Sequence, residues 1–214
     1  MDSQEYGRLR AVGETVVVVT AVVGAMTGVG VRSLAGRLAG RRPPPVSCEA
    51  ACLIVAVLAQ VAPTATGVFA TTVFGWWCVC LSAVDLLVRR LPNVLTVGGA
   101  GSILATAAVT GHGREAMVGA VLLAAPLCVT HLALPRSLGA GDVKLAVGLG
   151  AVAGIAGPAA LLVSALLPSV LTAGAATFTR VARARRRSEN CGVVLLPHGP
   201  SMCLATGVAL ITAG

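Results

Sequence analysis

The stretch GVFATTVFGWWCVCLSAVDLLV, residues 67–88, is almost entirely apolar and carries a single charged residue, Asp85, close to its end. It reaches the roughly 20 residues that an α-helix needs to cross the hydrocarbon core of a bilayer. A carboxylate costs about 2.5–3.5 kcal/mol at the bilayer centre on insertion scales, and less near the interface. The stretch therefore predicts a transmembrane helix, and Asp85 is a candidate for a functional role at its end.

Similar apolar stretches follow one another along the whole chain of 214 residues. The composition is 56% hydrophobic and only 11% charged, whereas soluble domains carry about 25% charged residues. The sequence therefore predicts an all-α fold, a polytopic transmembrane helical bundle that forms one integral membrane domain, residues 1–214. Eight spans are expected, at residues 15–31, 46–62, 67–88, 93–110, 115–134, 143–156, 159–179 and 200–214.

The basic residues give a net charge of +8 and lie mainly between the apolar stretches. With the N-terminus outside, thirteen of the sixteen Lys and Arg residues fall inside, and only Arg8, Arg10 and Arg114 fall outside. Cytoplasmic loops of membrane proteins are enriched in Lys and Arg, so this charge indicates orientation in the cell membrane rather than nucleic-acid binding. The same topology places Asp85 and Asp142 at the cytoplasmic edge.

Two of the cytoplasmic loops are longer than the others. Residues 32–45 end in three prolines and are expected to form a stiff connector. Residues 180–199 begin with an arginine-rich cluster. We interpret the cluster as an orientation signal, with contact to anionic lipid headgroups as the alternative.

The seven cysteines do not indicate a disulfide or a metal site. Most of them lie within apolar stretches, where a free cysteine behaves as a small hydrophobic residue. Their spacings are not those of a zinc site. His131 and His198 have no carboxylate or cysteine at helical spacing and are expected to be satisfied polar side chains. No cofactor is predicted.

The second conspicuous acid belongs to the tetrapeptide Gly139-Ala140-Gly141-Asp142. The two glycines allow the backbone to bend sharply and to approach another chain closely, which would suit an aspartate that faces an extended peptide. The motif alone is weak evidence in a chain with 26 glycines. Lys144 follows it by two positions and is expected either to extend toward the interface or to tune the charge of the acids.

The first acid is followed by a predicted turn at Pro92 and Asn93. Pro92 ends the preceding helix, and Asn93 is well suited to cap the next one. Without a catalytic role, Asp85 would be explained as an interfacial acid that pairs with Arg89, four residues further along a helix.

The combination of these motifs resembles the type IV prepilin peptidases, membrane aspartic proteases of the GxGD class. The resemblance rests on Asp85-x6-Pro92-Asn93-x-Leu95-Thr96, on residues 139–145, and on the tetrapeptide Pro197-His198-Gly199-Pro200. It covers about residues 67–214, with the N-terminal spans at 15–62 outside it. It implies that Asp85 and Asp142 are the catalytic pair, supported by Pro92, Asn93, Gly139, Gly141, Lys144, Pro197, Gly199 and Pro200.

The resemblance also implies the substrate. It would be the precursor of a type IV pilin or pseudopilin, with a short basic leader that ends in glycine and precedes an apolar helix. Cleavage would occur at the cytoplasmic face. Longer members of the family carry two Cys-x2-Cys pairs and an N-methyltransferase activity, but this chain has neither pair. It resembles a short form, to which methylation does not carry over.

Three other interpretations stay open. Presenilin-like proteases share Gly-x-Gly-Asp, but they typically have tyrosine before the first aspartate, where Val84 stands here. A small proton-coupled transporter would use the two acids as a relay and would need polar residues deeper in the spans. A non-enzymatic scaffold for pilus or secretion assembly would need degenerate aspartates.

Overall fold

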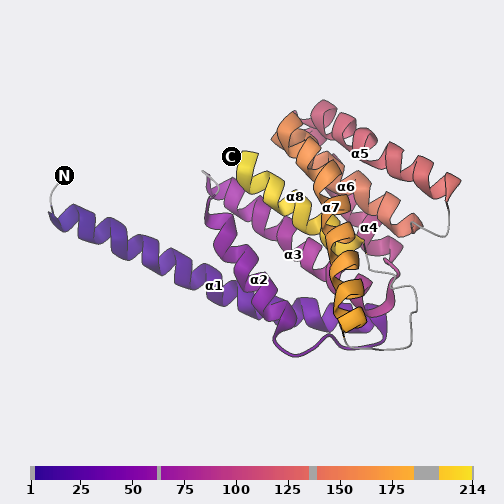
Figure 1. Ribbon diagram of the computed structural model, residues 1–214. Coiled ribbons are helices and arrows are strands. Elements are labelled where there is room, and N and C mark those ends of the chain that lie inside the picture. The colour runs from indigo at the N-terminus through magenta and orange to yellow at the C-terminus, as the bar shows by residue number, and fades with distance from the viewer. Residues whose placement is uncertain (1–2, 62–63, 135–138, 186–197, 214) are drawn as a thin grey trace. The chain divides into compact units, whose positions relative to one another are not determined.

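The computed structural model describes residues 3–61, 64–134, 139–185 and 198–213. These residues form eight α-helices and one short 3-10 helix, and no strand occurs among them. The predicted all-α fold is confirmed. The chain divides into two compact units, which we call unit 1 (Met1–Leu87) and unit 2 (Val88–Gly214). The helices are labelled in Figure 1.

Unit 1 holds α1 (Ser3–Ala39), α2 (Ser47–Leu58), the 3-10 helix η1 (Ala59–Val61) and all but the last residue of α3 (Ala65–Val88). The predicted spans at 46–62 and 67–88 match their helices closely. The span at 15–31 is only the middle of α1, which continues through Ala39. The expected connector at residues 32–45 is therefore wrong in its first half, because residues 32–39, with Arg32 and Arg37, belong to α1.

Close approach of α1 to α2 depends on two glycines of α1. A Cβ at Gly28 would overlap the Cα of Glu49, and one at Gly24 would lie 2.8 Å from the Cβ of Ala56. Small residues four apart are a common device for helix association in membranes. At the far end of this contact Arg32 Nε pairs with Glu49 Oε1 at 3.1 Å.

Unit 2 consists of five helices, α4 (Asn93–Val109), α5 (Gly113–Ala133), α6 (Ala140–Ala156), α7 (Pro158–Arg185) and α8 (Gly199–Ala213). All five predicted spans in this part of the chain correspond to one of them. α6 contacts each of the other four helices. Its core-facing residues include Leu145 and Leu149, which are fully buried. The helix that carries Asp142 is therefore the central helix of unit 2.

The turn between α6 and α7 consists of Gly157 alone. Its φ of 113° lies in a region that residues other than glycine rarely adopt. Pro158 then opens α7, where the missing N–H of a proline has no partner to lose. A single residue therefore separates the two helices, and α7 contacts α6.

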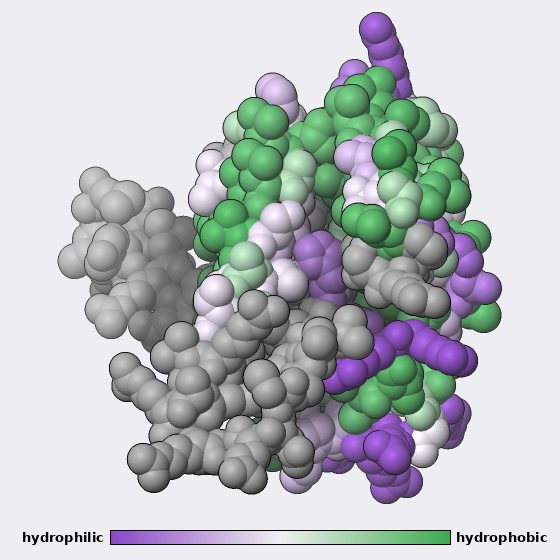
Figure 2. Space-filling view, turned by 45° about the vertical axis from the view of Figure 1, so that its right-hand side comes forward, coloured by the Kyte–Doolittle hydropathy of each residue, from purple (hydrophilic) through white to green (hydrophobic). Residues whose placement is uncertain are grey.

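Four described helical segments are long and apolar enough to cross a bilayer, namely Val18–Ala39, Gly67–Val88, Gly113–Ala133 and Pro158–Phe178. Ser47–Val61, Asn93–Val109 and Gly199–Thr212 are shorter apolar helices. Large apolar side chains are exposed along the long ones, for example Leu122 on α5 and Leu166 on α7. Apolar residues, green in Figure 2, accordingly cover much of the visible surface. Such a surface needs lipid around it, so the chain is a membrane protein.

Candidate active site

Asp85 lies in the last turn of α3 and is 6% exposed. Among the residues whose side-chain burial the structure describes, it is the only buried one that carries a charge. Burial of a carboxyl group in an apolar helix is costly, so such groups are usually functional. Arg89 lies beyond the end of α3, with a left-handed φ of 52° and an exposed side chain. Arg89 does not continue α3, so the helical spacing assumed for the pair does not hold, and the pairing of Asp85 with Arg89 itself stays a prediction.

The turn after α3 ends at Pro92, which takes the N-cap position of α4 in an extended conformation. The N–H groups of Leu95 and Thr96 both donate to the carbonyl oxygen of Pro92, each at 3.1 Å. No side chain caps this helix. The predicted capping role of Asn93 is wrong, because Asn93 is already the first helical residue and its side-chain oxygen has another partner.

That partner is Lys144 on α6. Its Nζ donates a hydrogen bond to Oδ1 of Asn93 at 2.7 Å. The bond joins the first residue of α4 to the first turns of α6, and hydrogen bonds with an ionised donor are stronger than neutral ones. Both residues belong to the motifs quoted above, but neither expectation for Lys144 included this contact. The predicted topology, which places both residues at the same membrane edge, was the available signal.

Asp142 is the third residue of α6, and Gly139 is the N-cap. The backbone N–H of Asp142 donates to the carbonyl oxygen of Gly139 at 3.1 Å. In return the carboxyl group accepts from the Gly139 backbone N–H. This is half of a capping box, and it holds the carboxyl group at the positive end of the helix dipole.

The environment of Asp142 changes its acidity. It lies ahead of the predicted span at 143–156 and is half-buried. Burial raises the pKa of the Asp142 carboxyl above its ordinary value near 3.8, and the hydrogen bond from Gly139 lowers it by less. The carboxyl group therefore keeps its proton to a higher pH than a solvated aspartate does.

The two glycines of the motif act differently from the expectation. Gly139 has an ordinary extended backbone, with φ −74° and ψ 143°, so the predicted sharp bend is wrong. Gly141 does permit a close approach, since a Cβ there would lie 3.1 Å from the Cβ of Leu91. A larger residue at position 141 would push the turn before α4 away from the start of α6.

The third motif opens α8. Pro197 lies outside the described residues. Gly199 and Pro200 are the first two residues of α8, where a proline is tolerated. Nδ1 of His198 lies 2.9 Å from Oγ1 of Thr172 on α7, so the predicted satisfied histidine is confirmed. Among the described residues no group of three His, Cys, Asp or Glu side chains could hold a metal ion.

Unit 2 therefore brings together Asn93, Gly139, Gly141, Asp142 and Lys144 around the start of α6. Asp85 belongs to unit 1. Its pairing with Asp142 stays a prediction.

A comparison with protein families matches residues 72–177 to the type IV leader peptidase family. The chain belongs to this family. The matched segment of this leader peptidase includes both aspartates, Pro92, Asn93 and Lys144, and it ends before His198. No curated protein and no solved structure gives a significant match. The family and the apolar helices together make the chain a membrane peptidase.

Proposed function

We propose that this leader peptidase is an aspartic endopeptidase of the cell membrane, with Asp85 and Asp142 as its catalytic pair. The single observation that carries the proposal is the position of Asp142 within the matched segment. It is a half-buried acid with a raised pKa at the start of the central helix of unit 2. The burial of Asp85 at the end of α3 supports the second half of the pair.

The proposed reaction needs one carboxylate and one carboxylic acid. The carboxylate takes a proton from a water molecule as the water oxygen attacks the scissile carbonyl carbon. The carboxylic acid donates its proton to the carbonyl oxygen, which gives a neutral tetrahedral intermediate. Collapse of this intermediate breaks the C–N bond. The leaving amine takes a proton from the carboxyl group that accepted one, and one hydroxyl of the intermediate returns its proton to the other carboxylate as the C=O bond re-forms. Two close carboxyl groups share a proton in this way because both cannot ionise cheaply.

Either aspartate can hold the shared proton, and the pair is expected to titrate jointly. The raised pKa of Asp142 supports a protonated carboxyl group on one side of the pair. Lys144 is an unsuitable direct partner for Asp142, because residues two apart on a helix point in different directions. Its bond to Asn93 instead fixes the start of α6 against α4, and thereby the position of the Asp142 backbone.

The proposed substrates are type IV prepilins or pseudopilins, cleaved behind their basic leader at the cytoplasmic face. The sequence supports this side, because the distribution of Lys and Arg places the ends of both aspartate-bearing helices inside. The precursor and the lipid bilayer are the proposed partners, and neither a cofactor nor nucleic acid is required. Both units would belong to one peptidase, and methylation is not among its proposed activities.

The test uses the full chain reconstituted in liposomes and a synthetic precursor with a basic leader, a glycine and an apolar segment. We expect Asp85→Asn and Asp142→Asn to reduce the cleavage rate at the glycine by about 100-fold or more. Glu115→Gln, which neutralises an acid in the first turn of α5, is the matched control. Cleavage at the wild-type rate by both aspartate variants would contradict the proposal.

A further inference from the structure

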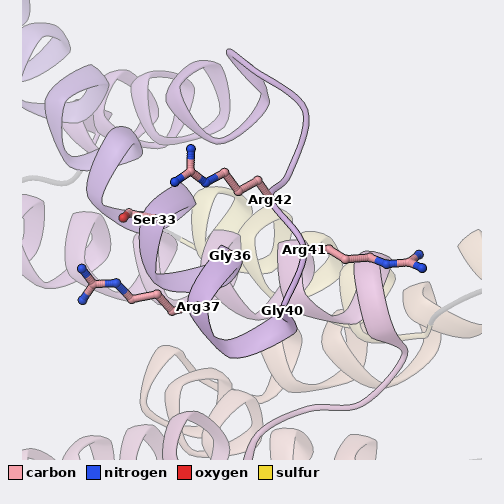
Figure 3. A pocket seen from close by; sticks show the side chains of 6 residues that line it. All are labelled: Ser33, Gly36, Arg37, Gly40, Arg41 and Arg42. Atoms are coloured by element: carbon pink, nitrogen blue, oxygen red, sulfur yellow. The ribbon is translucent and has the colours of Figure 1, made fainter.

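The last turns of α1 and the turn that follows form an open, basic pocket within unit 1. Its volume is about 420 Å³, and its lining consists of Ser33, Gly36, Arg37, Gly40, Arg41 and Arg42. Ser33, Gly36 and Arg37 are three and four residues apart, so they lie on one face of α1. In Figure 3 the side chains of Arg37 and Arg42 extend to the same side as the Ser33 hydroxyl, and Arg41 extends to the other side. The pocket therefore offers two guanidinium groups and a hydroxyl on one side.

Two glycines create the hollow. Gly40 follows the last residue of α1 with a φ of 65°, a left-handed conformation that ends helices and that glycine adopts at little cost. The chain then folds back, so that a Cβ at Gly36 would lie 3.3 Å from Cγ and 3.6 Å from Cα of Arg42. Any side chain at position 36 would enter the space that Arg42 borders. Binding of a ligand in this hollow should therefore depend on the absence of a side chain at position 36 as well as on charge.

The charge of the pocket is not neutralised within the described part of the chain. The nearby ion pair of unit 1 joins Arg32 to Glu49. Among the described acidic residues, none forms an ion pair with Arg37, Arg41 or Arg42, and these three side chains are exposed. Three uncompensated guanidinium groups around one hollow favour an anionic ligand. They disfavour the basic leader of a pilin precursor.

The position of the pocket at the end of an apolar helical segment favours an anion that belongs to a lipid. The apolar segment Val18–Ala39 ends beside it, which places the pocket at the depth of the lipid headgroups. Leu34 and Leu38 are exposed on the neighbouring face of α1, where an acyl chain could lie against them. Guanidinium groups recognise phosphate oxygens through paired hydrogen bonds. We propose that this pocket binds the phosphate group of an anionic phospholipid.

A rival explanation is that the arginines act only as an orientation signal, which requires charge and no pocket. Gly36→Leu separates the two, because it fills the hollow and leaves every charge in place. Gly30→Leu is the matched control, since nothing lies within 4 Å of a Cβ at that position of the same helix. Arg37→Gln/Arg42→Gln provides a second variant that leaves the hollow intact, so the test does not depend on recovery of Gly36→Leu alone.

The experiment measures binding of short-chain phosphatidylglycerol, short-chain phosphatidylcholine and inorganic phosphate to the full chain in detergent, by native mass spectrometry. We expect phosphatidylglycerol to bind the wild type and Gly30→Leu more tightly than phosphatidylcholine, by roughly fivefold for each guanidinium engaged. Gly36→Leu and the double glutamine variant should lose this preference.

Retention of the wild-type preference in Gly36→Leu, or in the double glutamine variant, would overturn the proposal. Equal binding of the two lipids by the wild type would also overturn it. Binding of inorganic phosphate that displaces phosphatidylglycerol at equal concentration would replace the lipid with free phosphate as the ligand. Lipid binding at this pocket is independent of the peptidase mechanism, so Asp85→Asn and Asp142→Asn should bind both lipids as the wild type does.

Discussion

Lys144 Nζ and Asn93 Oδ1 lie 2.7 Å apart and join two motifs that are separated by 51 positions in the sequence. Asn93 opens α4, and Lys144 lies one turn into the helix that also carries Asp142. The contact shows that the Pro-Asn turn and the Gly-x-Gly-Asp segment form one structural group in unit 2. The bond holds the start of α6 against the start of α4, and this fixes the position of the Asp142 backbone.

A double-mutant cycle tests this link. Asn93→Ala and Lys144→Ala should each lower the kcat of precursor cleavage, because the start of α6 loses its attachment to α4. Their effects on the free energy of unfolding should be non-additive by about 0.5–1.5 kcal/mol, the net value of a typical hydrogen bond. Lys144→Arg, which can still donate to Asn93, should stay close to the wild type. Fully additive effects in thermal unfolding would show that the two side chains do not interact.

Close packing of α5 against α6 yields a second prediction. A Cβ at Gly119 would overlap the carbonyl oxygen of Gly150, and one at Gly154 would overlap the carbonyl oxygen of Glu115. Alanine at Gly119 or Gly154 must therefore separate the two helices, at a cost of about 1–3 kcal/mol in the free energy of unfolding. The measurement is chemical unfolding in detergent micelles.

Gly98→Ala on α4 is the control for that experiment, because nothing lies within 4 Å of a Cβ at position 98. Alanine there should leave the free energy of unfolding unchanged or raise it by up to about 1 kcal/mol, since alanine is the better helix former. Equal losses at positions 98 and 119 would mean that glycine acts through the backbone and not through helix contact.

The positions of the helices could be predicted because the length of each apolar stretch can be counted directly along the sequence. Pro92 and the glycines at 111 and 157 lie between helices that correspond to predicted spans. The end of α7 differs, because this helix continues through Arg185 into the stretch expected to be a loop. Helix contacts could not be predicted in the same way. α6 carries apolar residues on every face, so its sequence pattern does not tell which face contacts α5. The spacing Gly150-x3-Gly154 is the sequence signal for this close packing, because small residues four apart let two helices approach.

For the candidate site, the sequence predicted which residues belong to it better than it predicted what each residue does. Its residues could be named from their motifs, and unit 2 does gather Asn93, Gly141, Asp142 and Lys144. Their individual roles were harder to predict, because a side chain near a helix start has several possible partners within reach. Asn93 could have capped its own helix, and the nearby ammonium group of Lys144 provided the alternative.

The raised pKa of Asp142 predicts how stability depends on pH. Its cause is burial, which penalises the charged form. Because the folded protein holds this proton more tightly than the unfolded chain, the free energy of unfolding should fall as the pH rises from about 3.8 through the raised pKa. Asp142→Asn has no such proton, and its side-chain oxygen can still accept from Gly139. The variant should therefore gain stability relative to the wild type as the pH rises from 4 to 7. A constant difference across this range in thermal unfolding would contradict the predicted shift.

The hydroxyl of Thr172 yields the last prediction. Its Oγ1 lies 2.9 Å from Nδ1 of His198 and 2.8 Å from Oγ of Ser201, so it links α7 to the start of α8. A consistent arrangement of protons has His198 donate to Thr172 and Ser201 donate to the His198 carbonyl oxygen. The single hydroxyl proton of Thr172 then has two acceptors, Ser201 Oγ and the Pro168 carbonyl oxygen of α7, each at 2.8 Å. Thr172→Val keeps the shape of the side chain but leaves these partly buried groups without their shared partner, and should cost about 1–3 kcal/mol in the free energy of unfolding.

Thr177→Val is the matched control on the same helix, because the Thr177 hydroxyl bonds only to backbone carbonyl groups of its own helix, those of Ala173 and Gly174. It should change the free energy of unfolding by a few tenths of a kcal/mol at most. The proposed proton arrangement requires a proton on His198 Nδ1, which both the neutral Nδ1–H form and the imidazolium ion supply. The loss caused by Thr172→Val should therefore be the same at pH 5 and pH 8. A loss that appears only at one of these pH values would show that His198 accepts from Thr172 rather than donating to it.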